Sequence, residues 1–477
     1  RDYYASRGLG DVYKRQGLGS IISKIIPLIM VPIVTRLMPS SDYYGISDLS
    51  NTVVSFGSAL AVMGMYDAMY RMFFEKDDES YKKKICSTAL CFTLITSLVI
   101  FLVMLLTKNL IAQCFFGDRQ YAYVVYLSAM ATLVGATNSI ISAPTRMQNK
   151  RKIFLVTNTI SPLLSYSISI PMLLAGHYVI ALPVAAVISG VTMEVAFGIM
   201  NREWFDPRQF DFTLLKELLA IAIPLLPNFL IYWVFNSCDK VMVTNMIGIG
   251  AAGIYSVGSK LGHASQLIYT AFAGGWQYFA FSTMKDNDQV ESTSNIFEYL
   301  GVLSFSCTAF VFALAQSIYQ ILFTGDYVSG YIISPYLFLA PLLQMLFQVA
   351  CNQFLVVKRT WPNMLILSGG AIANIAINYY LIPVLGIEGA AIATLAGYAI
   401  SDIVGVLVLQ KMNLLRIQPR FIATTGMMLV YILVWRLIIK DNVLVSFIAA
   451  VLTSLLMVLL YRKDLTKLLE NLKGKKK

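Results

Sequence analysis

Runs of about 20 apolar residues, each long enough to cross the ~30 Å hydrocarbon core of a bilayer as an α-helix, follow one another along most of the chain. Short polar segments separate them. They cover residues 18–38, 46–70, 85–106, 120–145, 153–175, 178–200, 214–247, 252–282, 296–323, 331–356, 361–384, 388–410, 420–440 and 443–461. The pattern predicts an all-α polytopic membrane protein with about fourteen transmembrane helices.

Residues of the first half have matching residues in the second half at a spacing of 208 or 209 positions. The matched pairs are Thr35 with Thr244, Phe115 with Phe323, Lys150 with Lys358, and Glu194 with Asp402. Each half holds six expected helices, an even number, so both copies enter the membrane in the same direction. The repeat therefore predicts two pseudo-symmetric six-helix bundles, an arrangement in which transporters bind substrates between the halves.

The repeat divides the chain into parts. We expect an N-lobe at 17–207, a C-lobe at 208–411, and a C-terminal part at 412–477 that holds the last two helices and a basic tail. Residues 1–16 carry several charges and lack the apolar core of a signal peptide. We expect them to be a non-native or disordered extension.

Composition and charge support this class of protein. Hydrophobic residues make up 57% of the chain and charged residues 13%, against about 25% charged in soluble domains. Most of the 37 Lys and Arg residues fall in alternate loops when the N-terminus is placed inside, which puts both termini in the cytoplasm. The net charge of +11 is thereby explained by loops that face anionic lipid, without nucleic acid.

Cysteine and histidine offer little chemistry. The six cysteines show no metal-binding spacing and most lie within apolar runs, so we assign them no role. With two histidines in the chain, a histidine-built metal centre is disfavoured, and no metal site is expected.

Lysines within the apolar runs are candidates for a cationic cavity, because charge inside the membrane is costly and marks function. Lys260 and His263 are three residues apart and share one helix face. That face suits an anionic head group such as a phosphate, although Lys260 could instead neutralise Asp239. Lys24, in the first run, is a second candidate.

The run at 214–247 carries Asp239 and Lys240, which lie about 100° apart around the helix axis. One is expected to face the cavity while the other snorkels or pairs across helices. Asp48, in the second run, could pair with Lys24 or bind a coupling cation, and structural pairing is an equal alternative. Glu194 and Asp402 could line an inner vestibule, but their symmetry favours an architectural role.

Paired prolines occur in the first and seventh runs. Pro27 and Pro32 precede the first loop, and Pro224 and Pro227 lie in the matching run of the second half. Proline removes a backbone donor and kinks a transmembrane helix. These positions are candidate hinges for alternating access, and static bends are the alternative.

The stretch IISKIIPLIMVPIVTRLMPSSDYYGISDL, followed in the second half by IPLLP, SCDKVMV and GAAGIYSVGSKL, resembles the O-antigen and capsule repeat-unit flippases. These belong to the multidrug/oligosaccharidyl-lipid/polysaccharide (MOP) exporter superfamily, which includes the MATE transporters. The resemblance covers residues 18–461. It implies two six-helix lobes around a cationic cavity, and transport of an undecaprenyl-diphosphate-linked sugar repeat across the bacterial inner membrane.

Lipid II flippases of the same superfamily carry a basic residue after a serine in helix 1 and another in helix 8. Lys24, which follows Ser23, and Lys260 match these two positions, and the resemblance implies that they contact the diphosphate. Lys240 is a third candidate. The further arginines of lipid II flippases have no counterpart at 30–34 or 48–53, which disfavours lipid II as the cargo.

We therefore expect a flippase for a lipid-linked oligosaccharide that serves surface polysaccharide biosynthesis by alternating access. Other MOP-type exporters, either a lipid II flippase or a cation-coupled multidrug antiporter, are the alternative within transport. A membrane polymerase or glycosyltransferase is disfavoured because the outer loops are short. The expected protein is a monomer without cofactor, coupled to Na⁺ or H⁺, with membrane lipids, a polysaccharide polymerase and chain-length machinery as partners. Asp48, Asp239 and His263 are the candidates for ion coupling or for lining the cavity.

Overall fold

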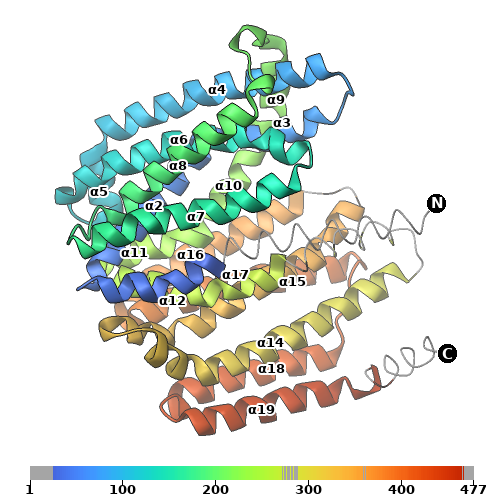
Figure 1. The fold of residues 1–477 in the computed structure, drawn as a ribbon. Helices are drawn as coiled ribbons and strands as arrows, with labels where there is room; N and C mark the ends of the chain where they lie inside the picture. The colour runs from blue at the N-terminus through green and yellow to red at the C-terminus, as the bar shows by residue number, and fades with distance from the viewer. Residues whose placement is uncertain are drawn as a thin grey trace. The chain divides into compact units, whose positions relative to one another are not determined.

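The computed structural model describes residues 25–270, 272, 276, 280, 283, 288–357, 359, 361–464 and 466. The regular elements formed by these residues are helices throughout (Figure 1). The expected all-α fold class is therefore confirmed.

Within the described residues, eleven helices are long and apolar enough to cross a membrane, and a bent pair of helices makes a twelfth if it counts as one span. The eleven are α4 (Glu79–Leu106), η1 with α6 (Arg119–Met147), α7 (Arg151–Leu174), α8 (Ala181–Met200), the segment Phe212–Met246, α14 (Gln289–Leu322), α15 (Ser334–Val356), α16 (Trp361–Leu385), α17 (Ile387–Lys411), α18 with η8 (Pro419–Ile439) and α19 (Val443–Leu460). All twelve coincide with expected runs. The other two runs, 18–38 and 252–282, extend into residues outside the description, so the count of fourteen stays a prediction.

The chain divides into two compact units. Unit 1 comprises Arg1–Ser256 with Ile382–Ile387, and unit 2 comprises Val257–Leu381 with Glu388–Lys477. In unit 1, α6 packs against α4, α8 and α2, which run alongside it in Figure 1. In unit 2, α14 packs against α15, α18 and α19. The lobes expected at 17–207 and 208–411 stay a prediction.

The second apolar run is broken rather than continuous. It forms α2 (Ser41–Val62) and α3 (Met65–Phe73), whose axes differ by 48°. Met63 and Gly64 between them adopt left-handed backbone conformations, with φ of 50° and 77°. A left-handed residue ends the α-helical hydrogen-bond ladder, and glycine takes this conformation without steric cost. The expected single helix over 46–70 is therefore wrong at this point.

The connection between the two repeats is attached to unit 1. The backbone N–H of Asp206 donates to Ser87 Oγ (2.9 Å), and that of Asp211 donates to Thr88 Oγ1 (3.1 Å), both hydroxyls belonging to α4. The Asp211 side chain then caps α9 (Phe212–Ala222) by accepting from two N–H groups of its first turn. The start of the second repeat is thus held by the first.

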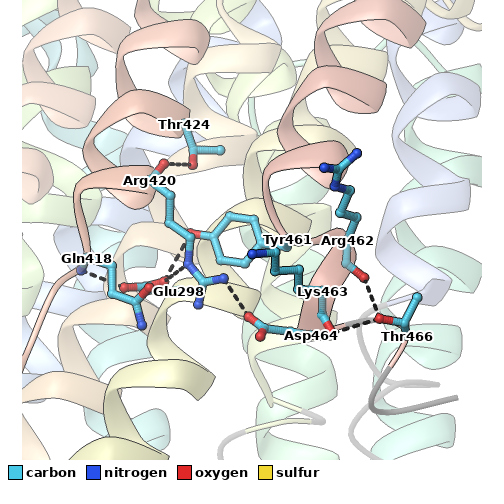
Figure 2. Close-up of polar contacts among 9 residues, drawn as sticks. All are labelled: Glu298, Gln418, Arg420, Thr424, Tyr461, Arg462, Lys463, Asp464 and Thr466. Atoms are coloured by element: carbon cyan, nitrogen blue, oxygen red, sulfur yellow. Dashed lines mark hydrogen bonds and ion pairs between the residues drawn. The ribbon is translucent and has the colours of Figure 1, made fainter. Parts of the chain in front are cut away.

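Two carboxylates fix the C-terminal helices to unit 2. Glu298 on α14 is fully buried (0% exposed). It accepts hydrogen bonds from the Gln418 backbone N–H (2.8 Å), Arg420 Nε (3.1 Å) and the Tyr461 hydroxyl (3.1 Å), as Figure 2 shows. Arg420 also pairs with Asp464 at 2.5 Å. These residues, the Glu298 cluster, join α14 to both α18 and α19.

The other carboxylate lies at the opposite end of α18. Glu388, at the start of α17, is 3% exposed and accepts from the Tyr336 hydroxyl (3.0 Å) and from Arg436 Nε (2.5 Å). Arg436 lies in the π-helical turn Trp435–Ile439 that ends the span. Since ion pairs hold both of its ends, α18 is an integral part of unit 2.

Candidate functional site

The seventh apolar run contains two departures from regular helix. After α9 ends at Ala222, the segment Ile223–Leu225 forms a 3-10 turn that includes Pro224. Helix α10 (Leu226–Trp233) follows, with Pro227 in its first turn. Proline has no N–H for the helical ladder and its ring clashes with the preceding turn. The break therefore falls where the sequence placed a candidate hinge, and the hinge role itself stays a prediction.

A π-helical turn, Val234–Cys238, then precedes α11 (Asp239–Met246). Such a turn inserts an extra residue and rotates the next helical segment about its axis, and π turns are frequent at functional sites. Here it sets the direction of Asp239 and Lys240, the first two residues of α11.

Lys240 forms an ion pair with Asp48 of α2. Its Nζ lies 2.5 Å from Asp48 Oδ2, and the two side chains are 15% and 5% exposed. The sequence singled out Asp48 and Lys240 separately and did not predict that they pair. The structure joins them. In the arrangement seen here the Lys240 ammonium is engaged by a carboxylate.

Asp239 points elsewhere, as expected for the neighbouring residue of a helix. It is 3% exposed, and its Oδ2 accepts a hydrogen bond from the Tyr255 hydroxyl of α12 (Ile249–Gly262) at 2.8 Å. Adjacent charges on α11 therefore bind different helices of unit 1. The sequence predicts that one of the two faces the cavity while the other snorkels or pairs across helices. The role of Asp239 in ion coupling and that of Lys240 in binding the diphosphate stay predictions.

Aromatic packing fixes the position of α10 and α11. Trp233 donates from Nε1 to Ser55 Oγ of α2 at 3.1 Å, and its ring lies 4.8 Å from that of Phe56 and 6.2 Å from that of Phe115, by ring centroids. Asn245 donates to the Cys114 carbonyl of α5 (Lys108–Phe116) at 2.7 Å. The Asp48–Lys240 pair is therefore flanked by contacts that join α10 to α2 and α11 to α5. Helix α5 was not predicted, because its apolar residues follow α4 with a single residue between them.

The breaks of the second and seventh runs lie against each other. A Cβ added at Gly64 would be 2.6 Å from the carbonyl oxygen of Ala222, the last residue of α9. Beyond the breaks, α3 and α9 share a core in which Met69, Leu215 and Leu218 are buried. The bend of the second run and the 3-10 turn of the seventh run are thus in contact.

The prolines of the first apolar run do not interrupt its helix. The described helix Ile25–Leu37 continues through both Pro27 and Pro32. The paired prolines of the two halves are therefore not structurally equivalent, and a hinge at Pro27 or Pro32 stays a prediction. Lys24 precedes this helix and lies outside the described residues.

Lys260 lies near the end of α12, in unit 2. Gly258 and Gly262 flank it and pack closely on the following elements, since an added Cβ would lie 2.4 Å from Ile333 Cγ1 and 2.7 Å from Leu337 Cβ. Residues four apart share a helix face, whereas Lys260, two residues from each glycine, is on the opposite face. Both Lys260 and His263 are half-buried, and both interact with other residues. Among the described residues no group of three or more His, Cys, Asp or Glu could hold a metal ion.

Comparison with protein families is decisive for the class of protein. A family model described as "Polysaccharide biosynthesis protein" matches residues 33–330. The chain belongs to this family. A comparison with curated proteins found no match.

Solved structures of transporters share the fold of this family member. The lipid II flippase MurJ, in an inward closed conformation, aligns with a TM-score of 0.72 and 15% identity, over 94% of this chain and 99% of that chain. An inward-facing multidrug resistance MATE transporter aligns with a TM-score of 0.59 and 15% identity, over 83% and 98%. A MOP superfamily transporter from Pyrococcus furiosus gives 0.56 and 13%, over 84% and 95%. The expected MATE-like fold is therefore confirmed.

Proposed function

We propose that the protein is a flippase that moves an undecaprenyl-diphosphate-linked oligosaccharide repeat unit to the outer leaflet of the bacterial inner membrane. The match to a polysaccharide biosynthesis family over residues 33–330 carries the proposal, because it connects a transporter fold to glycan assembly. The fold likeness to a lipid II flippase supports a lipid-linked cargo. The excess of basic residues in alternate loops supports cytoplasmic termini.

We assign the recognition of the diphosphate to lysines. A diphosphate offers several anionic oxygens to ammonium donors, and charge-assisted hydrogen bonds of this kind are strong. Lys24 and Lys260 occupy the positions that the family resemblance implies. Lys240 is a third candidate, and its ion pair with Asp48 would have to open before it could bind a phosphate.

Energy coupling by Na⁺ or H⁺ is part of the proposal, with Asp48, Asp239 and His263 as candidate groups. The polysaccharide polymerase and chain-length machinery are the proposed partners in the membrane, and the transporter itself is proposed to be a monomer. Alternating access would use the break at Pro224 as a hinge, because proline interrupts the α-helical hydrogen-bond ladder there.

A cation-coupled multidrug exporter is the second candidate, supported by the fold likeness to MATE transporters. A cavity for cationic drugs would be dominated by acids. The lysines of the apolar runs therefore disfavour a multidrug exporter. The missing arginines at 30–34 and 48–53 disfavour lipid II as the cargo.

Complementation tests the diphosphate assignment. A strain that lacks this gene and its surface polysaccharide would receive wild type, Lys24→Ala or Lys260→Ala, with the exposed Lys152→Ala as the matched control. We expect Lys152→Ala to restore the polysaccharide and the other two variants to fail while being inserted at normal levels. Full restoration by both would refute the cationic site.

A further inference from the structure

A carboxylate of unit 2 has no hydrogen-bonding partner in the part of the chain that the structure describes. Asp402 lies in α17, and both of its carboxylate oxygens are shielded from solvent without a donor within reach. Its counterpart in the repeat, Glu194 on α8, accepts a hydrogen bond from Thr137 Oγ1 at 2.6 Å. The two acids thus occupy matching places in the sequence, and the second lacks the hydroxyl that serves the first.

Close packing encloses Asp402. One turn further along α17, a Cβ added at Gly405 would be 3.4 Å from Cys351 Sγ and from the Phe347 ring, both on α15. Cys351 and Phe347 are 3% and 2% exposed. The absence of a side chain at Gly405 lets α17 approach α15, which shields the carboxyl group from water.

Among the residues that the structure describes, few charged groups are near enough to compensate a carboxylate there. The sequences of α15 and α16, which pack against α17, contain no Asp, Glu, Lys, Arg or His. Their titratable groups are Tyr336, Tyr379, Tyr380 and Cys351, and the Cys351 thiol interacts with Asp402. On α17 itself, Glu388 is 14 residues away and paired with Arg436, and Lys411 is nine residues away, or about 13 Å along the axis at 1.5 Å per residue.

An ionised carboxylate that is buried without counter-ion or donors is strongly disfavoured, and such groups take up a proton instead. We propose that Asp402 is a proton-binding site of unit 2. It is a neutral carboxylic acid while α15 and α17 are packed as observed, and it transfers its proton to water when their separation hydrates it. The products are then carboxylate and hydronium, and repacking requires that a proton returns from water. If the proposed flippase function holds, this exchange would add Asp402 to the candidate groups for proton coupling, beside Asp48, Asp239 and His263.

Infrared spectroscopy of the purified full chain in lipid nanodiscs tests the protonation directly. With ¹³C-labelled aspartate at pH 7.5, exposed aspartates are ionised, since their usual pKa is about 3.9. We expect an isotope-shifted C=O band of a protonated aspartic acid in wild type, its loss in Asp402→Asn, and its retention in the exposed control Asp326→Asn. Absence of the band from wild type, or its persistence at full strength in Asp402→Asn, would overturn the proposal.

Two further measurements test the protonation of Asp402 without relying on the Asp402→Asn variant alone. If Asp402→Asn does not fold, Asp402→Glu should also remove the labelled aspartate band, because the glutamate is unlabelled. After transfer to D₂O, the band should shift over a time much longer than the mixing time, because the proton exchanges only when α15 and α17 separate. A shift that is complete within the mixing time would contradict this gating by helix packing. None of these readouts needs a substrate, so their failure leaves the flippase proposal intact, and failure of complementation leaves the protonation result intact.

Discussion

Lys240 Nζ lies 2.5 Å from Asp48 Oδ2, so a lysine of the seventh apolar run is neutralised by an acid of the second. Both side chains are largely removed from solvent, and each belongs to a span that is broken elsewhere along its length. Breaking such a buried pair from one side leaves an uncompensated charge, which is more costly than replacing both partners.

The first prediction concerns the stability that this pair provides. Asp48→Asn and Lys240→Met should each lower the free energy of unfolding by about 3–5 kcal/mol, and the double variant should lose less than the sum, with a coupling of about 0.5–3 kcal/mol. Chemical unfolding of the purified protein in a double-mutant cycle measures this. The control is the pair of Lys82 with Asp77, whose carboxylate is fully exposed to solvent, and no measurable coupling is expected there. Additive losses at Asp48 and Lys240 would contradict the interpretation.

The second prediction concerns the contact between the two breaks. Gly64→Ala should destabilise the protein, because the new Cβ would be 2.6 Å from the Ala222 carbonyl oxygen and φ is +77°. A left-handed alanine alone costs about 1–2 kcal/mol, and the overlap adds to it. Gly198→Ala in α8 is the control and should be neutral or stabilising, because the added Cβ would meet nothing within 4 Å apart from the backbone of its own helix. Equal thermal stabilities of the two variants would show that the contact is not tight.

Much of the fold could be predicted from the sequence because the membrane imposes it. A span must satisfy its backbone hydrogen bonds internally, so long apolar runs are helices, and twelve of the expected runs coincide with observed spans. The break at Met63 and Gly64 was missed because a left-handed residue leaves the apolar pattern unchanged. Pro224 was found because proline removes a donor wherever it occurs in a helix.

Pairing between distant residues was less predictable. The sequence identified Asp48, Asp239 and Lys240 as unusual, since charge is rare within apolar runs. Which of them pair depends on the π-helical turn Val234–Cys238, which rotates α11 and has no clear signature in the sequence. Glu298 and Arg420 were not singled out, because they lie near the ends of the expected runs 296–323 and 420–440, where charge is common.

The third prediction concerns the Glu298 cluster. Glu298→Gln should lower the free energy of unfolding of unit 2 by about 3–5 kcal/mol, since Arg420 loses a buried counter-ion. Tyr461→Phe removes one hydrogen bond to a charged group and should cost about 1.5–3 kcal/mol. Limited proteolysis should then release the C-terminal helices from both variants sooner than from the exposed-residue control Arg462→Gln. Unchanged proteolysis of both would show that other contacts hold α18 and α19.

The fourth prediction concerns topology. In a cysteine-free background, Lys150→Cys and Arg208→Cys should be shielded from a membrane-impermeant thiol reagent in intact cells, whereas Arg119→Cys should react. All three positions are exposed in the structure, so accessibility to the reagent reports the side of the membrane. Labelling of Lys150→Cys and Arg208→Cys in intact cells would invert the proposed orientation.

The most direct test of the proposed function is the lipid that accumulates when the gene is deleted and assembly of the repeat unit continues. Mass spectrometry of membrane lipids should find an undecaprenyl-diphosphate-linked oligosaccharide that wild type clears and Lys260→Ala does not. The accumulated lipid should be inaccessible to a glycan-binding probe added outside spheroplasts. A deletion strain without such a lipid, or one in which the lipid is already exposed on the outer leaflet, would contradict the proposed flippase function.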